Sequence, residues 1–174
     1  MKNKRLLHYT KVQPYDSHPE LPIDPDAVQS GQYRWPLHFT PSLIFIVFIG
    51  GCAGAYARYY VSQYMPSATN GWPISTLFVN LLGAFLLGFL LEGLVRIGPD
   101  QGARRLVRLA VGTGFMGAFT TYSSFVSDIY LLLQHHHTLV AASYGSLTIL
   151  GGLVLSALGI WSAASHHERR ENRA

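Results

Sequence analysis

Charged residues are scarce in this chain. Asp, Glu, Lys and Arg make up 13% of its 174 residues, about half of the roughly 25% that is usual in soluble proteins. Cysteine occurs once, as Cys52, which excludes a disulfide within the chain. Apolar residues dominate the sequence after residue 41. The composition therefore favours a protein embedded in a lipid bilayer, and we expect no nucleic-acid partner and no enzymatic activity.

The two ends of the chain differ from its middle. Residues 1–40 combine prolines with scattered charges and have no periodic apolar pattern, so we expect residues 1–41 to form a disordered cytoplasmic tail. We do not expect this segment to be a signal peptide, because no apolar core follows its basic start. Residues 165–174 are expected to form a basic cytoplasmic tail.

Between the tails lie four apolar segments. Each of them reaches the length of about 20 residues that a helix needs to cross a bilayer, and they cover residues 42–63, 74–95, 106–133 and 139–164. Lipid offers the backbone no water as a partner, so each segment should be helical. The sequence therefore predicts an all-α integral membrane domain over residues 42–164, with four transmembrane helices per subunit.

Basic residues are absent from the first and third predicted loops. Five precede the first span, four lie in or beside the second loop, and three follow the last span, which places 12 of the 13 on one side. Positive charge favours the cytoplasmic side, so both termini should be cytoplasmic in a multi-pass protein of the plasma membrane. The exception is Arg58, which lies inside the first span and must either reach the interface or line a wet vestibule.

The third segment contains the stretch "GTGFMGAFTTYSSF", residues 112–125, which is unusually small and polar for a membrane span. It holds three glycines, three threonines and two serines, and each glycine weakens a helix by about 1 kcal/mol relative to alanine. We therefore expect the third helix to be broken here. Broken helices at membrane depth are tolerated only when they are buried in protein or line a cavity, where freed carbonyl groups can hold ions. A continuous helix with a packed small face is the alternative.

Two further features need an explanation. Asn80 is the one strongly polar residue in the middle of the second span, and it must find a partner across a helix interface or face a wet path. Tyr122 and Phe125 are three residues apart and so share a helix face. Their ring edges could face an anion, although ordinary packing explains the spacing equally well.

Three motifs taken together resemble those of the CrcB/Fluc family of bacterial fluoride channels. They are "GGCAGAYARY", "STLFVNLLGAFLLG" and "GFMGAFTTYSSF", and the resemblance covers roughly residues 44–162. It implies a four-helix subunit that forms an antiparallel, dual-topology dimer. It also implies passive efflux of fluoride through two pores at the dimer interface, which would lower the cytoplasmic fluoride concentration.

The resemblance also implies roles for individual residues. A structural sodium ion would be held by the backbone carbonyl groups of Gly117 and Thr120 from both subunits. Asn80 would be the pore amide and Arg58 the vestibule arginine. The residues that would line the fluoride path are Asn80, Tyr122, Phe125, Thr121, Ser123, Ser124, Tyr144 and Arg58, with Thr148 and Ser156 as weaker candidates.

The chain departs from the family pattern at two positions. Tyr122 stands where the family usually has Phe, which adds a hydroxyl group to one pore aromatic. Ala118 stands where a second glycine is common, and it would be strained if the backbone there needed the freedom of glycine.

Alternatives to a homodimeric channel follow from the same residues. The one-sided charge favours a subunit that inserts in one orientation and pairs with an oppositely oriented paralogue, although insertion both ways is the other interpretation. A non-conducting partner subunit is a further candidate. A small multidrug-type exporter fits poorly, because the first span has no acidic residue. A metalloenzyme built on His135, His136, His137 and Asp128 would need several converging ligands.

Overall fold

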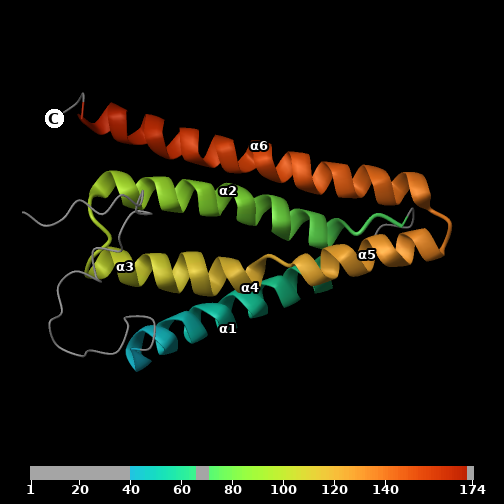
Figure 1. Ribbon diagram of the computed structural model, residues 1–174, viewed down its shortest axis with the longest axis horizontal. Coiled ribbons are helices and arrows are strands. Elements are labelled where there is room, and N and C mark those ends of the chain that lie inside the picture. Colours follow the sequence, from blue (N-terminus) through green and yellow to red (C-terminus); the bar gives the residue numbers. More distant parts are fainter. Residues whose placement is uncertain (1–39, 66–70, 172–174) are drawn as a thin grey trace, which may run out of the picture. The chain divides into compact units, whose positions relative to one another are not determined.

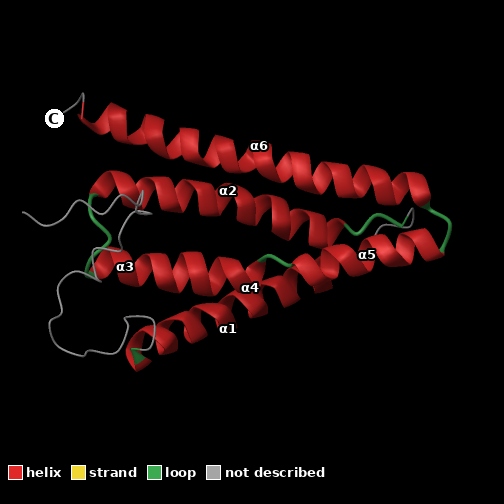
Figure 2. Cartoon of the chain, viewed as in Figure 1, coloured by secondary structure: helices red, strands yellow, loops and turns green. Residues whose placement is uncertain are grey.

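The computed structural model describes residues 40–65 and 71–171, and every regular element in these ranges is helical. Figures 1 and 2 show the elements and their order. The elements are α1 (Pro41–Tyr64), α2 (Ile74–Ile97), α3 (Ala103–Val107), η2 (Arg108–Met116), α4 (Gly117–Phe119), α5 (Tyr122–Gln134) and α6 (Thr138–Glu171). The predicted tail over residues 1–41 lies almost entirely outside the described residues.

Three helices in the described part of the chain are long and apolar enough to cross a membrane. They are Pro41–Tyr64, Ile74–Ile97 and Thr138–His167. They agree closely with the first, second and fourth predicted spans. The last helix continues to Glu171, so α6 includes residues 165–171 of the predicted C-terminal tail.

The third apolar segment is broken, as the sequence predicts. Helical winding ends at Phe119 and resumes at Tyr122. Thr120 and Thr121 between them are extended, with φ/ψ of −80°/159° and −149°/121°. Because the segment is divided, neither of its helical parts has the length of a single membrane-spanning helix. Figure 2 marks the break as a short loop between α4 and α5.

Local chemistry explains where the helices start and stop. Pro41 occupies the first turn of α1, where its missing N–H costs nothing. Gly98 ends α2 with a φ of 137° that favours glycine, and Pro99 follows it. Thr121 caps α5, since its side-chain oxygen accepts a hydrogen bond from the Ser124 amide at 3.1 Å.

Glycines allow the helices to pack backbone against backbone. A side chain at Gly54 would overlap the carbonyl oxygen of Phe115, and one at Gly159 would overlap that of Phe85. These contacts join α1 to η2 and α2 to α6, the two pairs of elements that pack most extensively. The bundle is therefore held by close contacts between small residues, as is usual for helices in lipid.

Two apolar clusters flank the break. One contains the buried residues Val79, Met116 and Phe119, and the other contains Phe125, Leu132, Ala141 and Tyr144. The first lies between α2 and the end of η2 and α4, and the second lies between α5 and α6. The break therefore sits where packing changes from one cluster to the other.

Candidate functional site

The break in the third segment is stabilised by the side chain of Asn80. The Asn80 Nδ2 group donates a hydrogen bond to the Thr121 carbonyl oxygen at 3.0 Å, and the Thr121 amide donates to Asn80 Oδ1 at 2.8 Å. One amide side chain on α2 thus satisfies both the donor and the acceptor of an extended residue. Thr121 is buried, with 8% of its surface exposed, and lipid would leave these groups without partners.

Gly83 brings α2 close enough for this contact. A Cβ atom at Gly83 would overlap the side-chain methyl group of Thr120. Gly83 lies three residues after Asn80 and so on the same side of α2. The sequence therefore places a small residue beside the amide that holds the break.

The break also diverts amide groups that would otherwise complete helical hydrogen bonds. In an unbroken helix the Thr121 amide would donate to the Gly117 carbonyl and the Ser124 amide to the Thr120 carbonyl. Here the Thr121 amide donates to Asn80, and the Ser124 amide donates to the hydroxyl oxygen of Thr121. The Gly117 and Thr120 carbonyl oxygens therefore do not receive these two helical hydrogen bonds. Backbone carbonyl oxygens are suitable ligands for a hard cation.

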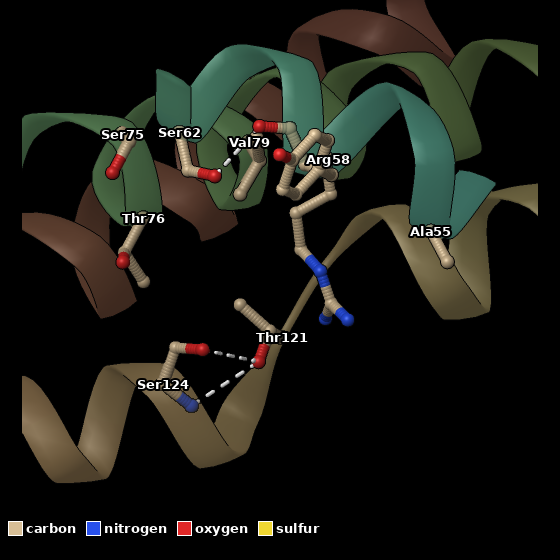
Figure 3. Close-up of a pocket in the computed structure, with 9 residues that line it drawn as sticks. Ala55, Arg58, Ser62, Ser75, Thr76, Val79, Thr121 and Ser124 are labelled. Atoms are coloured by element: carbon tan, nitrogen blue, oxygen red, sulfur yellow. Dashed lines mark hydrogen bonds between the residues drawn. The ribbon is translucent and has the colours of Figure 1, made fainter. Parts of the chain in front are cut away.

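A pocket of about 260 Å³ opens beside the break (Figure 3). Side chains of α1, α2 and α5 line it, together with Thr121, and most of them are polar. They are Ala55, Arg58, Tyr59, Ser62, Ser75, Thr76, Val79, Thr121 and Ser124. Figure 3 shows the guanidinium group of Arg58 reaching from α1 across this space toward Thr121.

Hydrogen bonds order the polar wall of the pocket. The Thr121 hydroxyl lies 3.1 Å from that of Ser124 and 3.4 Å from that of Ser123. The Ser62 hydroxyl donates to the Tyr59 carbonyl at 2.7 Å, within α1. The pocket thus presents hydroxyl groups and one cation in a chain that has few charged residues.

The structure gathers only part of the predicted set at this pocket. Arg58, Thr121 and Ser124 line it. Asn80 is not a lining residue, but its side chain is hydrogen bonded to the main chain of Thr121. Thr76 is a lining residue that the sequence analysis missed. Its position one helical turn before Asn80 is the signal that could have revealed it.

The aromatic candidates lie on α5 and α6. The Tyr122 and Phe125 ring centroids are 6.2 Å apart, as their spacing predicts. Tyr122 is 79% exposed, whereas Phe125 is buried against Tyr144 with centroids 5.5 Å apart. Tyr144 is fully buried, and its hydroxyl donates to Asp128 at 3.3 Å. Thr148 bonds the carbonyl of Tyr144 within α6 at 2.8 Å.

Ala118, which stands where the family commonly has a second glycine, causes no backbone strain. Ala118 lies within α4, and among the described residues His136 is the one non-glycine residue with positive φ. Gly117 likewise has helical angles of −62° and −30°. Glycine is therefore not required at position 118 by the backbone.

The metalloenzyme alternative finds no ligand set in the described ranges. Nowhere in residues 40–65 and 71–171 do three His, Cys, Asp or Glu side chains gather as metal ligands would. His135 instead hydrogen bonds through its ring to the Leu131 carbonyl at 2.8 Å, at the end of α5.

These features define a class: a helical membrane protein with one broken element and a polar pocket at the break. A family model described as "CrcB-like protein, Camphor Resistance (CrcB)" matches residues 45–160, and the chain belongs to this family.

Similar proteins come from several bacteria. "Fluoride-specific ion channel FluC 1" of Cutibacterium acnes is 41% identical over 116 residues, which cover 67% of this chain and 81% of that protein. "Fluoride-specific ion channel FluC 2" of Leifsonia xyli is 38% identical over 141 residues, covering 81% and 97%. "Fluoride-specific ion channel FluC 2" of Moorella thermoacetica is 44% identical over 116 residues, covering 66% and 90%.

Proposed function

We propose that this chain is a subunit of a fluoride-specific ion channel that lets fluoride leave the cytoplasm passively. The observation that carries the proposal is the polar pocket at the helix break, which is lined by Arg58 and several side chains with hydroxyl groups. The names of the relatives support the same ion. The polar groups of the pocket suit fluoride for a physical reason.

Fluoride is small and strongly hydrated, so a pore must replace its water with hydrogen-bond donors. Hydroxyl groups and the guanidinium group of Arg58 are such donors. The positive charge of Arg58 would also raise the local anion concentration at the pocket mouth. The Asn80 amide has two N–H groups, of which one donates to Thr121, and the second would be available to the ion.

The aromatic pair would extend this path beyond the pocket. Tyr122 and Phe125 present ring edges, which carry partial positive charge. Tyr122 is largely exposed on the surface of the subunit, so a second subunit covering it would enclose the path. We therefore propose two pores at the interface of an antiparallel dimer, with Ser123, Tyr144, Thr148 and Ser156 as further candidates for the lining.

A sodium ion at the break is part of the proposal. The Gly117 and Thr120 carbonyl groups fit a hard cation, because the amides that would bond them in a helix donate elsewhere. Gly117 is exposed, which would let a second subunit supply the remaining ligands. Such an ion would tie the two broken helices together. Replacing sodium by a larger monovalent cation should dissociate the dimer, as measured by light scattering, and an unaffected dimer would refute this site.

The proposed setting is the plasma membrane of a bacterium. Three described helices have the length to cross it, and we propose that the broken segment crosses as a fourth element. Both termini would then lie in the cytoplasm, where the positive charges favour them. The charge bias further suggests a heterodimer with an oppositely oriented paralogue.

Fluoride efflux from proteoliposomes tests the proposal. Purified protein in vesicles loaded with fluoride, followed with a fluoride electrode, should release the ion, whereas vesicles loaded with chloride should retain theirs. The measurement is made with this chain alone and then with a paralogue from the same organism. Efflux that needs the paralogue would support the heterodimer. Absence of fluoride efflux in both preparations would contradict the proposed function.

A further inference from the structure

A second cavity lies at the opposite end of α2 from the polar pocket's mouth, where α2 turns into α3. Its volume is about 460 Å³, and it has one apolar and one charged side. The lining residues are Leu91, Leu94 and Val95 of α2, Gly98, Pro99 and Asp100 of the turn, and Arg104 and Arg108 beyond it. None of the residues assigned above to fluoride or sodium takes part.

The turn positions Arg104 over the end of α2. The Arg104 Nη1 group donates a hydrogen bond to the Ile97 carbonyl at 2.9 Å. A Cβ atom at Gly98 would lie only 2.7 Å from the same nitrogen, so glycine at this position makes room for the guanidinium group. A guanidinium group carries five N–H donors in a planar fork, and this contact directs one of them.

Asp100 bonds two further arginines, Arg105 and Arg108. The Arg108 Nη2 group lies 2.7 Å from the Asp100 carboxylate, and Arg105 donates to the Asp100 backbone carbonyl at 2.9 Å. The hydrogen bond from Arg108 holds the pKa of the Asp100 carboxyl below its usual value. Three arginines against one ionised carboxylate leave this cluster with a net charge of +2.

The apolar side of the cavity faces outward from α2. Val95 is 73% exposed and Leu91 is 38% exposed, and both belong to a helix that is long and apolar enough to cross the membrane. In a bilayer crossed by α2, this apolar wall would adjoin acyl chains, and the arginines beyond the end of the helix would lie near the headgroups. Basic pockets of this construction, between helices at the membrane surface, suit anionic headgroups.

We propose that this cavity binds an anionic phospholipid, with its phosphate at Arg104 and Arg108 and the start of an acyl chain along Leu91, Leu94 and Val95. Guanidinium groups match phosphate oxygens in geometry as well as in charge. The apolar wall is what selects a lipid over free phosphate. Net positive charge disfavours the ammonium group of a zwitterionic headgroup, so the site should prefer phosphatidylglycerol over phosphatidylcholine.

Native mass spectrometry of the full-length protein in detergent tests this inference. Phosphatidylglycerol and phosphatidylcholine are added at equal concentration, and lipid adducts are counted. We expect the wild type to retain phosphatidylglycerol preferentially and Arg104→Gln to weaken that binding about fivefold, the contribution of one basic group near an anionic surface. Arg104→Lys keeps the charge and should recover part of the binding.

Arg96→Gln is the matched control. Arg96 also lies at the end of α2, but its guanidinium group pairs with Glu92 at 2.6 Å and does not line the cavity. This variant should bind phosphatidylglycerol as the wild type does. Equal loss in both variants would mean that diffuse charge alone attracts lipid, and would overturn the site.

Two further results would also overturn the inference. One is a wild type that shows no preference for phosphatidylglycerol, which decides the question even if the variants fail to fold. The other is displacement of the lipid by inorganic phosphate at the same concentration, which would assign the site to free phosphate. The assay measures no fluoride transport, so its outcome is independent of the proposed channel function.

Discussion

Asn80 stabilises the main chain at the break in the third segment. Both heteroatoms of its amide bond the main chain of Thr121, which is buried at the break. A residue with only a donor or only an acceptor could satisfy one of these groups, but not both. Asparagine is therefore suited to stabilise an extended residue inside a membrane, and the sequence indicated only that its amide needed a partner.

Replacing Asn80 by Ala should destabilise the protein and lower fluoride efflux. The change orphans a buried N–H and a buried carbonyl, each at a cost of about 1–3 kcal/mol. Thermal unfolding in detergent measures the first effect, and the fluoride electrode measures the second. Thermal unfolding thus reports whether Asn80 holds the break, and efflux normalised to folded protein reports whether the path depends on Asn80, directly or through Thr121.

Thr148→Ala provides the control for the stability part of this prediction. The Thr148 hydroxyl bonds the Tyr144 carbonyl within α6, so its removal orphans no group across a helix interface. We expect its stability to stay within about 0.5 kcal/mol of the wild type, in the normal range for such substitutions. An Asn80→Ala protein that is as stable as Thr148→Ala would show that the bridge to Thr121 contributes nothing.

At the scale of elements, close packing of α1 against the third segment helps to fix its conformation. Gly54 lets α1 approach the Phe115 carbonyl, and Gly114 in turn lies close to the Val47 carbonyl. The segment between Arg108 and Met116 winds as a π-helix, a form that is rare and often marks functional sites. Helix propensity predicts weakness throughout residues 112–125, but packing against α1 and α2 decides that the chain opens at Thr120 and Thr121.

Gly54→Ala should push α1 away from the broken element. The new methyl group would overlap the backbone of Phe115, which cannot rotate aside, and overpacking of this kind costs about 1–3 kcal/mol. Thermal unfolding should detect the loss, and efflux should fall because Arg58 on α1 moves relative to Thr121.

Gly51→Ala is the matched control in the same helix. A Cβ atom at Gly51 meets its nearest neighbour, the Gly114 carbonyl oxygen, at 3.9 Å, which is an ordinary contact. The higher helix propensity of alanine should leave this variant as stable as the wild type or slightly more so. Equal destabilisation by both substitutions would contradict a specific contact at Gly54.

At the scale of the whole molecule, the charge distribution should decide how the chain inserts. Arg96, Arg104, Arg105 and Arg108 all lie at or near the turn from α2 to α3, whereas the turn from α5 to α6 carries His135–His137 and no Lys or Arg. A chain with so one-sided a charge should insert in one orientation.

Reporter fusions at the C-terminus measure this orientation. A reporter active only in the cytoplasm should give signal, and one active only outside should give almost none. Substituting Arg96, Arg104, Arg105 and Arg108 by Gln should raise the external signal, since the bias is then reduced. Equal signals from both reporters in the wild type would instead support dual insertion and a homodimer.

The sequence alone determined the positions of the three long apolar helices, the segment that breaks and the need of Asn80 for a partner. These properties depend on residues near one another in the chain, because the cost of burying polar groups in lipid is set locally. Only the tertiary structure decided that the partner is Thr121, 41 positions away, that Thr76 and Arg58 share its pocket, and that Tyr122 faces outward while Phe125 is buried. Those outcomes depend on how close glycines allow the helices to come, which no local pattern specifies.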